Sequence, residues 1–158
     1  MMGTEIERKF LIKNDTWRNS ATAGVKYIQG YFTTNERCSI RVRIEGDEAA
    51  INIKSATIDI TRSEYNYPLP VKDAREMLDN LCEKPLIEKT RYHLEYDGHV
   101  WDIDEFSGEN QGLVIAEIEL EKTDEKFTRP GWLGKEVSDD PRYYNVCLIN
   151  NPYKNWTV

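Results

Sequence analysis

The chain of 158 residues lacks the marks of several protein classes. No apolar run approaches the roughly 20 residues that a membrane-spanning helix needs. The N-terminal Met-Met-Gly-Thr-Glu has neither the basic nor the apolar stretch of a secretory signal. The three cysteines, Cys38, Cys82 and Cys147, are odd in number and lack a paired metal-ligand spacing. We therefore expect reduced thiols in a cytoplasmic protein that has no membrane partner.

The sequence also lacks an excess of basic residues. It has 21 Lys and Arg against 28 Asp and Glu, which gives a net charge of −7. This balance disfavours a general nucleic-acid binder, so an anionic ligand must meet a local basic patch. The length predicts a single domain over residues 1–158, and the 39% hydrophobic content is that of a globular protein.

Alternation of charged and apolar residues is the strongest pattern that is present. Glu5, Glu7 and Lys9 would share one face of a strand, and Ile6 and Phe10 would share the other. The same two-residue spacing of charge recurs in most later strand candidates, with both signs represented. Several such faces turned toward one another would form a charged interior.

Strand patterns dominate the chain and turn signals separate them. Further strands are predicted at residues 25–34, 38–45, 51–54, 60–67, 86–96, 99–106 and 113–121. Gly46-Asp47 and Asp97-Gly98 predict hairpin turns. A short helix is expected after Asn14, and an amphipathic helix from Val71 to Cys82. The aromatic residues of the tail, Trp132, Tyr143, Tyr144, Tyr153 and Trp156, are expected to pack as a lid or brace over the sheet.

Antiparallel strands with polar stripes can close into a barrel, which turns one stripe inward and removes the sheet edges. The predicted lumen bases are Lys9, Arg41, Arg43, Lys54, Arg62, Lys89 and Arg91. The predicted lumen acids are Glu5, Glu7, Glu64, Asp102, Asp104, Glu117 and Glu119. Buried charges must be paired or coordinated, and a metal-bound polyphosphate would satisfy both signs. Carboxylate oxygens favour hard cations such as Mg²⁺ or Mn²⁺, and Arg and Lys suit phosphate oxygens.

The N-terminal segment Glu5-Ile6-Glu7-Arg8-Lys9 resembles the Glu-x-Glu-x-Lys signature of the CYTH superfamily, also called the triphosphate tunnel metalloenzymes. Further segments follow in the order of that family: Arg41-Val42-Arg43, Ile53-Lys54, Glu64, Glu88-Lys89-Thr90-Arg91-Tyr92, Asp102-Ile103-Asp104-Glu105-Phe106 and Ala116-Glu117-Ile118-Glu119-Leu120. The tail segments Gly134-Lys135-Glu136-Val137 and Arg142-Tyr143-Tyr144-Asn145 also look like the closing part of the family. The resemblance covers nearly the whole chain.

This resemblance implies an α+β fold, in which an eight-stranded antiparallel barrel forms a triphosphate tunnel with helices packed outside. It implies that Glu5, Glu7, Glu117 and Glu119 hold Mg²⁺ or Mn²⁺, as two ions. It assigns phosphate binding to Arg41, Arg43, Lys54, Lys89 and Arg91, and it places Lys9 near the terminal phosphorus and its attacking water. Phosphoryl transfer relies mainly on positioning and fixed cations, so no serine, cysteine or histidine nucleophile is required.

Several other polar residues have more ordinary interpretations. Asp102 and Asp104, with Arg62 and Glu64, are candidates for a second layer around the site; the two aspartates could equally neutralise neighbouring bases. Arg8 is expected to form an outward ion pair. The histidines are interpreted as an ordinary surface residue, His93, and as an exposed residue beside a turn, His99.

The leading functional hypothesis is metal-dependent hydrolysis of inorganic tripolyphosphate to pyrophosphate and orthophosphate. The alternatives are a class IV type adenylate cyclase, a thiamine or nucleoside triphosphatase, and a polyphosphate-binding module without turnover. A cyclase would need a site for adenine and ribose, and the sequence contains no recognisable feature of that kind. A non-catalytic module would be indicated by loss of Glu5, Glu7 or Lys9, and all three are present.

Overall fold

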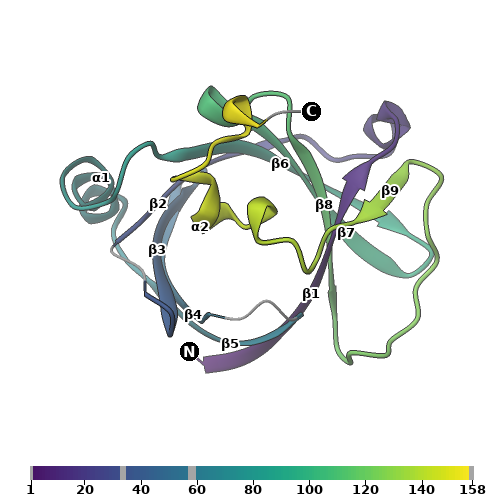
Figure 1. Cartoon of the computed structure of the whole chain (residues 1–158), viewed down its shortest axis with the longest axis horizontal. Coiled ribbons are helices and arrows are strands. Elements are labelled where there is room, and N and C mark those ends of the chain that lie inside the picture. The colour runs from purple at the N-terminus through teal and green to yellow at the C-terminus, as the bar shows by residue number, and fades with distance from the viewer. Residues whose placement is uncertain (1, 33–34, 57–59, 157–158) are drawn as a thin grey trace.

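The computed structural model describes residues 2–32, 35–56 and 60–156. Its strands are β1 (Met2–Ile12), β2 (Val25–Tyr31), β3 (Cys38–Glu45), β4 (Glu48–Ser55), β5 (Thr61–Pro68), β6 (Ile87–Tyr96), β7 (His99–Ser107), β8 (Val114–Leu120) and β9 (Leu133–Glu136). They form one sheet in the order β5-β4-β3-β2-β6-β7-β8-β1-β9, and β5 also pairs with β1. That pairing closes β1–β8 into the predicted eight-stranded antiparallel barrel (Figure 1).

Strand β1 has three partners. Its first half pairs with β5, with Glu5 opposite Arg62, and β8 pairs with residues further along, with Lys9 opposite Glu117. Strand β9 adds to β1 at the barrel wall, and the register shifts between Phe10 and Ile12. The sequence patterns did not predict β9.

The helices are short and few in the part of the chain that the structure describes. They are η1 (Asp15–Asn19), α1 (Val71–Asn80), η2 (Gly108–Asn110), η3 (Pro141–Tyr143), α2 (Asn145–Leu148) and η4 (Tyr153–Asn155). Helix α1 ends at Asn80, two residues before the predicted end, and strand β2 ends at Tyr31. The predicted continuation of β2 to residues 33–34 lies outside the described residues. The hairpin turn after β6 has positive φ angles at Asp97 and Gly98, as the sequence predicted.

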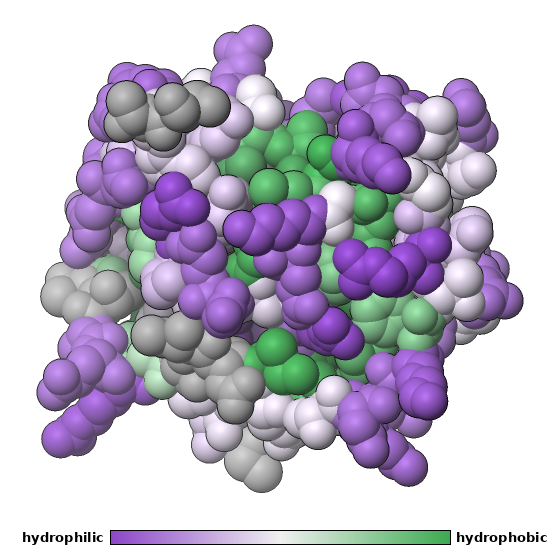
Figure 2. Space-filling model, turned by 45° about the vertical axis from the view of Figure 1, so that its right-hand side comes forward, coloured by the Kyte–Doolittle hydropathy of each residue, from purple (hydrophilic) through white to green (hydrophobic). Residues whose placement is uncertain are grey.

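Two apolar clusters lie on the outer faces of the barrel. Helix α1 packs Ala74 and Leu78 against Val42 and Ile44, as expected for a helix outside the barrel. On the other side, Phe10 and Trp101 pack under the segment that leads to β9. Trp132 belongs to this outer cluster, and its ring lies 5.5 Å from that of Trp101 in β7, so it packs against the sheet as expected. Figure 2 shows the right-hand side of the barrel, where hydrophobic surface lies between hydrophilic side chains.

A third apolar cluster fills one end of the barrel interior. Tyr31, Ile87 and Phe106 point inward from their strands and pack against Tyr143 and Leu148 of the tail. The expectation that every helix packs outside was therefore wrong for α2, which lies within the ring of strands in Figure 1. The lumen is apolar at this end and polar toward the other. No helix among the described residues is long and apolar enough to cross a membrane.

Candidate active site

A cavity of about 340 Å³ occupies the polar part of the lumen. Its walls contain every predicted lumen base and every predicted lumen acid except Asp104: Glu5, Glu7, Lys9, Arg41, Arg43, Lys54, Arg62, Glu64, Lys89, Arg91, Asp102, Glu117 and Glu119. Alternation along seven strands therefore brings together side chains that are far apart in the sequence.

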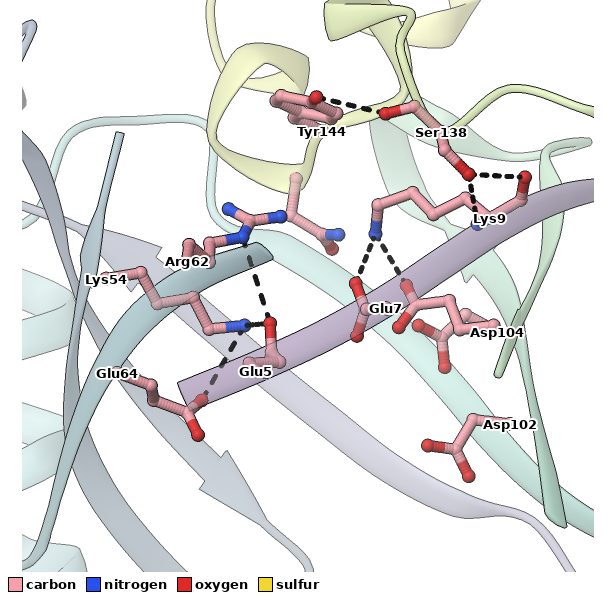
Figure 3. Close-up of polar contacts among 12 residues, drawn as sticks. Glu5, Glu7, Lys9, Lys54, Arg62, Glu64, Asp102, Asp104, Ser138 and Tyr144 are labelled. Atoms are coloured by element: carbon pink, nitrogen blue, oxygen red, sulfur yellow. Dashed lines mark hydrogen bonds and ion pairs between the residues drawn. The ribbon is translucent and has the colours of Figure 1, made fainter. Parts of the chain in front are cut away.

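Adjacent strands place four carboxylates close together. In the β1–β8 register, Glu7 lies opposite Glu119, and Glu117 lies opposite Lys9. Glu5 precedes Glu7 on the same face of β1. The Lys54 ammonium lies 3.0 Å from Glu5 Oε1 (Figure 3). This arrangement concentrates negative charge along β1 and β8.

Lys9 is buried between two of these carboxylates. Its Nζ lies 2.8 Å from Glu117 Oε1 and 3.2 Å from Glu7 Oε1. Burial disfavours both charges, but Glu117 and Glu7 outweigh it for Lys9 and raise its pKa. Burial likewise opposes ionisation of Glu7, yet Lys9 and Lys54 lower its pKa to about 2. Both groups are therefore charged at neutral pH.

The remaining acid of this group, Glu119, is less well compensated. No hydrogen bond or ion pair with another described residue engages its carboxylate. Burial raises the pKa of Glu119, and the nearby charges of Glu5, Glu7 and Glu64 raise it further. An excess of carboxylate oxygens, without histidine or thiolate, fits a hard divalent cation such as Mg²⁺ or Mn²⁺. Within the described residues no three acids, histidines or cysteines form a ready-made metal-ligand group, and Lys9 and Lys54 pair with the acids instead.

Arginines form a separate positive group in the same cavity. The guanidinium groups of Arg43 and Arg91 lie 4.8 Å and 4.9 Å from the centre of the Tyr27 ring. Burial lowers the pKa of Arg43 to about 10, and the charges of Arg41 and Arg91 contribute to the shift. Arg41 Nε is buried without a hydrogen-bond partner among the described residues. Arg43 pairs with Glu45 at 3.1 Å, and Arg91 pairs with Asp104 at 2.7 Å. Arg41 forms no ion pair with another described residue, so its guanidinium can still bind the anionic oxygen atoms that it prefers.

Asp104 does not line the cavity, contrary to the prediction. It is completely buried, and its carboxylate accepts two hydrogen bonds from Arg91, at 2.7 Å and 2.8 Å. Asp104 Oδ2 also lies 2.8 Å from Lys89 Nζ. Asp104 therefore neutralises and orients Lys89 and Arg91. Neutralising neighbouring bases was the second of its two predicted roles.

Asp102 reaches the cavity wall, where it lies 2.5 Å from His93 Nδ1 and 3.6 Å from Arg91. His93 is about half exposed, as expected for a surface histidine, at 46% of its side chain. The prediction for His99 was wrong: it is partly buried, because its Nε2 lies 2.8 Å from Glu125 and its ring packs on Phe127. Arg8 pairs with Glu136 on the outer face, as predicted.

The sequence analysis did not select several residues of the cavity wall. They are Tyr31, Ser39, Asn52, Asn66, Tyr144, Asn145 and Val146. Asn52 shares the inward face of β4 with Lys54, so alternation alone could have selected it. Tyr144 and Asn145 come from the irregular tail, whose path into the barrel has no periodic signal in the sequence.

Comparison with protein families matches residues 3–144 to the CYTH domain. An inorganic triphosphatase of Acetivibrio thermocellus is 48% identical over 155 residues, which cover 98% of this chain and 99% of the relative. An inorganic triphosphatase of Nitrosomonas europaea is 36% identical and covers 92% of this chain and 96% of its own.

Among solved structures, the crystal structure of the inorganic triphosphatase NE1496 has a TM-score of 0.66 and 34% sequence identity. The alignment covers 92% of this chain and 93% of that one. Sequence and fold agree over nearly the full length, with the cavity inside the matched barrel. The chain therefore belongs to the CYTH domain family.

Proposed function

We propose that this protein hydrolyses inorganic tripolyphosphate to pyrophosphate and orthophosphate with the help of a divalent metal ion. The observation that carries the proposal is that one cavity contains a cluster of positive charges, the arginines around Arg41, and a cluster of negative charges, the carboxylates around Glu119. A metal-bound triphosphate would compensate both groups, because its oxygens suit guanidinium and its metal suits carboxylate. The activity named for both relatives supports the same substrate class.

The side chains have separate roles in the proposed reaction. Arg41, Arg43, Lys54, Lys89 and Arg91 bind the phosphate oxygens and hold the substrate in line for attack by water. Lys9, fixed by Glu7 and Glu117, presents its ammonium to the negative charge that develops on the terminal phosphoryl group. Catalysis then depends on prearranged charge rather than on a covalent intermediate.

The proposed metal ligands are Glu5, Glu7, Glu117 and Glu119. Mg²⁺ or Mn²⁺ fits this all-oxygen set, and we propose that two ions bind. Bound there, the metal would neutralise phosphate charge and lower the pKa of a coordinated water. The proposed location is the cytoplasm, since the three cysteines are unpaired.

A substrate panel tests the proposal directly. Phosphate release is measured from tripolyphosphate, pyrophosphate, ATP and thiamine triphosphate with Mg²⁺ and with Mn²⁺, beside cyclic AMP formation from ATP. We expect tripolyphosphate to be the preferred substrate and turnover to stop when the metal is chelated. Preferred formation of cyclic AMP would instead assign the cavity to a cyclase, and binding without turnover would assign it to a polyphosphate-binding module.

Substitutions of the bases should separate binding from catalysis. We expect Arg41→Ala and Arg43→Ala to raise KM and also lower kcat, because a guanidinium contacts phosphate in both the ground state and the transition state. Lys9→Ala should act mainly on kcat, since its charge is matched to the transition state. Steady-state kinetics of the three variants supply both constants. Equal effects of Lys9→Ala and Arg41→Ala on KM and kcat would refute this division of roles.

Ligand binding should stabilise the protein, because the like charges of the empty cavity repel one another. Tripolyphosphate with Ca²⁺, chosen to favour binding over turnover, should stabilise the native state by about 2.7 kcal/mol at a hundredfold excess over its dissociation constant. For a domain of this size the melting temperature should rise by roughly 5 to 10 °C. Orthophosphate with Ca²⁺ should do much less, because one phosphate cannot reach bases on several strands. Equal shifts at matched ionic strength would indicate a solvated charged surface instead of a triphosphate site.

A further inference from the structure

A chain of hydrogen bonds beside the cavity has its direction fixed by Lys89. Lys89 Nζ lies 3.1 Å from Asn145 Oδ1. Burial lowers the pKa of Lys89 to about 8, so it is still mostly an ammonium at pH 7. An ammonium can only donate, so it must face the carbonyl oxygen of the Asn145 amide and not the NH₂ group. The charge of Lys89 therefore sets the orientation of Asn145.

Asn145 in turn sets the orientation of Gln29. The Gln29 side chain is completely buried, and its Nε2 donates to Asn145 Oδ1 at 3.2 Å. Turning this amide over would bring two acceptor oxygens together. The observed orientation has a cost, because Gln29 Oε1 is left buried without a partner among the described residues. The Gln29 amide keeps this orientation because its NH₂ group donates to Asn145.

This series of hydrogen bonds ends at the hydroxyl of Tyr31, a residue of the cavity wall. Gln29 Nε2 lies 3.3 Å from Tyr31 Oη and acts there as a donor. The guanidinium of Arg41 also acts on this hydroxyl, and a guanidinium can donate hydrogen bonds but cannot accept them. A phenol has one proton and can accept two hydrogen bonds, so both neighbours can only fill its acceptor sites. Burial raises the pKa of Tyr31, so the proton is present at neutral pH. It has no acceptor among the described residues.

We propose that Tyr31 is a substrate-binding residue whose hydroxyl donates a hydrogen bond to a phosphate oxygen in the cavity. Lys89, Asn145 and Gln29 position it, since they prevent its proton from turning back toward the barrel wall. The inference rests on the proposed function and adds a neutral donor to the cationic phosphate site. It also gives the tail, through Asn145, a part in orienting the ligand site.

Isothermal titration with tripolyphosphate at a fixed Ca²⁺ concentration tests the role of the hydroxyl. Tyr31→Phe removes the donor and keeps the ring, so affinity should fall about ten- to a hundredfold, as expected for a hydrogen bond to a charged acceptor. Tyr92→Phe is the matched control, because Tyr92 does not line the cavity. Its ring packs against Trp17 and its hydroxyl lies 3.5 Å from Glu105 Oε1, so loss of that hydroxyl should change affinity less than about twofold.

A double-mutant cycle tests the positioning role of Gln29. Gln29→Leu should weaken binding severalfold in the wild-type background, because the Tyr31 hydroxyl is then free to turn. It should have no further effect in the Tyr31→Phe background. A general structural effect of Gln29→Leu would weaken binding equally in both backgrounds. That result would overturn the proposal that Gln29 positions the Tyr31 hydroxyl.

The outcomes separate this inference from the proposed function. Wild-type protein that does not bind tripolyphosphate would overturn the proposed function and the inference with it. Wild-type binding, together with unchanged affinity in folded Tyr31→Phe, would overturn the inference alone. A loss confined to Tyr31→Phe, with Tyr92→Phe close to wild type, supports it.

Discussion

Replacing Glu7 by glutamine is expected to slow tripolyphosphate hydrolysis about a thousandfold or more, and Glu5→Gln should have a similar effect. Glutamine keeps the shape of the side chain but removes the anionic oxygen that the proposed metal site requires. Glu7 also lies 3.2 Å from the Lys9 ammonium, so its loss should also disturb the group that we propose to act in catalysis. Rates with Mg²⁺ and Mn²⁺ and the affinity for metal in the presence of tripolyphosphate should be measured together.

Glu136→Gln provides a control for this experiment. Glu136 also contacts β1, but it pairs with Arg8 on the outer face of the barrel. Its replacement should leave the rate near that of the wild type. Circular dichroism and melting curves would establish that every variant is folded. Near-normal metal-dependent rates in folded Glu5→Gln and Glu7→Gln would remove these glutamates from the mechanism.

Asp104→Asn is expected to cost about 3–5 kcal/mol of stability, because it leaves the buried charges of Lys89 and Arg91 without their main counter-ion. Asp104 is completely buried, accepts two hydrogen bonds from Arg91 and forms an ion pair with Lys89. For a domain of this size, the loss corresponds to a fall in melting temperature of roughly 6 to 20 °C. Chemical denaturation gives the free energy directly.

Asp102→Asn is the matched control for Asp104. Asp102 lies two residues away on the same face of β7, but 32% of its side chain is exposed and its nearest Arg91 contact is 3.6 Å. Its replacement should cost about 1 kcal/mol or less. If the two variants lost the same stability, the buried position of Asp104 would not be what makes it important.

Alternation in the sequence predicted the strands and the inward residues because a strand has a strict two-residue period. It could not distinguish Asp104 from Asp102, since the period gives the face of a strand but not the depth along the lumen. Depth is decided by the tail, which closes one end of the barrel around Tyr143 and Leu148. A chain of such short helices leaves no periodic signal of where it packs.

Strand β9 and the network of Gln29 and Asn145 escaped prediction for related reasons. Strand β9 has four residues, too few to establish an alternating pattern. Gln29 and Asn145 are neutral amides separated by 116 residues in the chain, and only the three-dimensional structure brings them together. The charged residues were easier to predict because buried charges must be paired or bound by a ligand, which indicated that they share one site.

The three-sided pairing of β1 has a consequence for how the active site assembles. Hairpins such as β3–β4 and β6–β7 join neighbouring segments, so they can form while the rest of the chain is still unfolded. The contact between Lys9 and Glu117 spans 108 residues and needs β8 to meet β1. We therefore expect the carboxylates of β1 and β8 to come together late in folding, after the local hairpins. During biosynthesis, β1 is made first, and its acids can line the cavity only after most of the chain, including β8, has been translated.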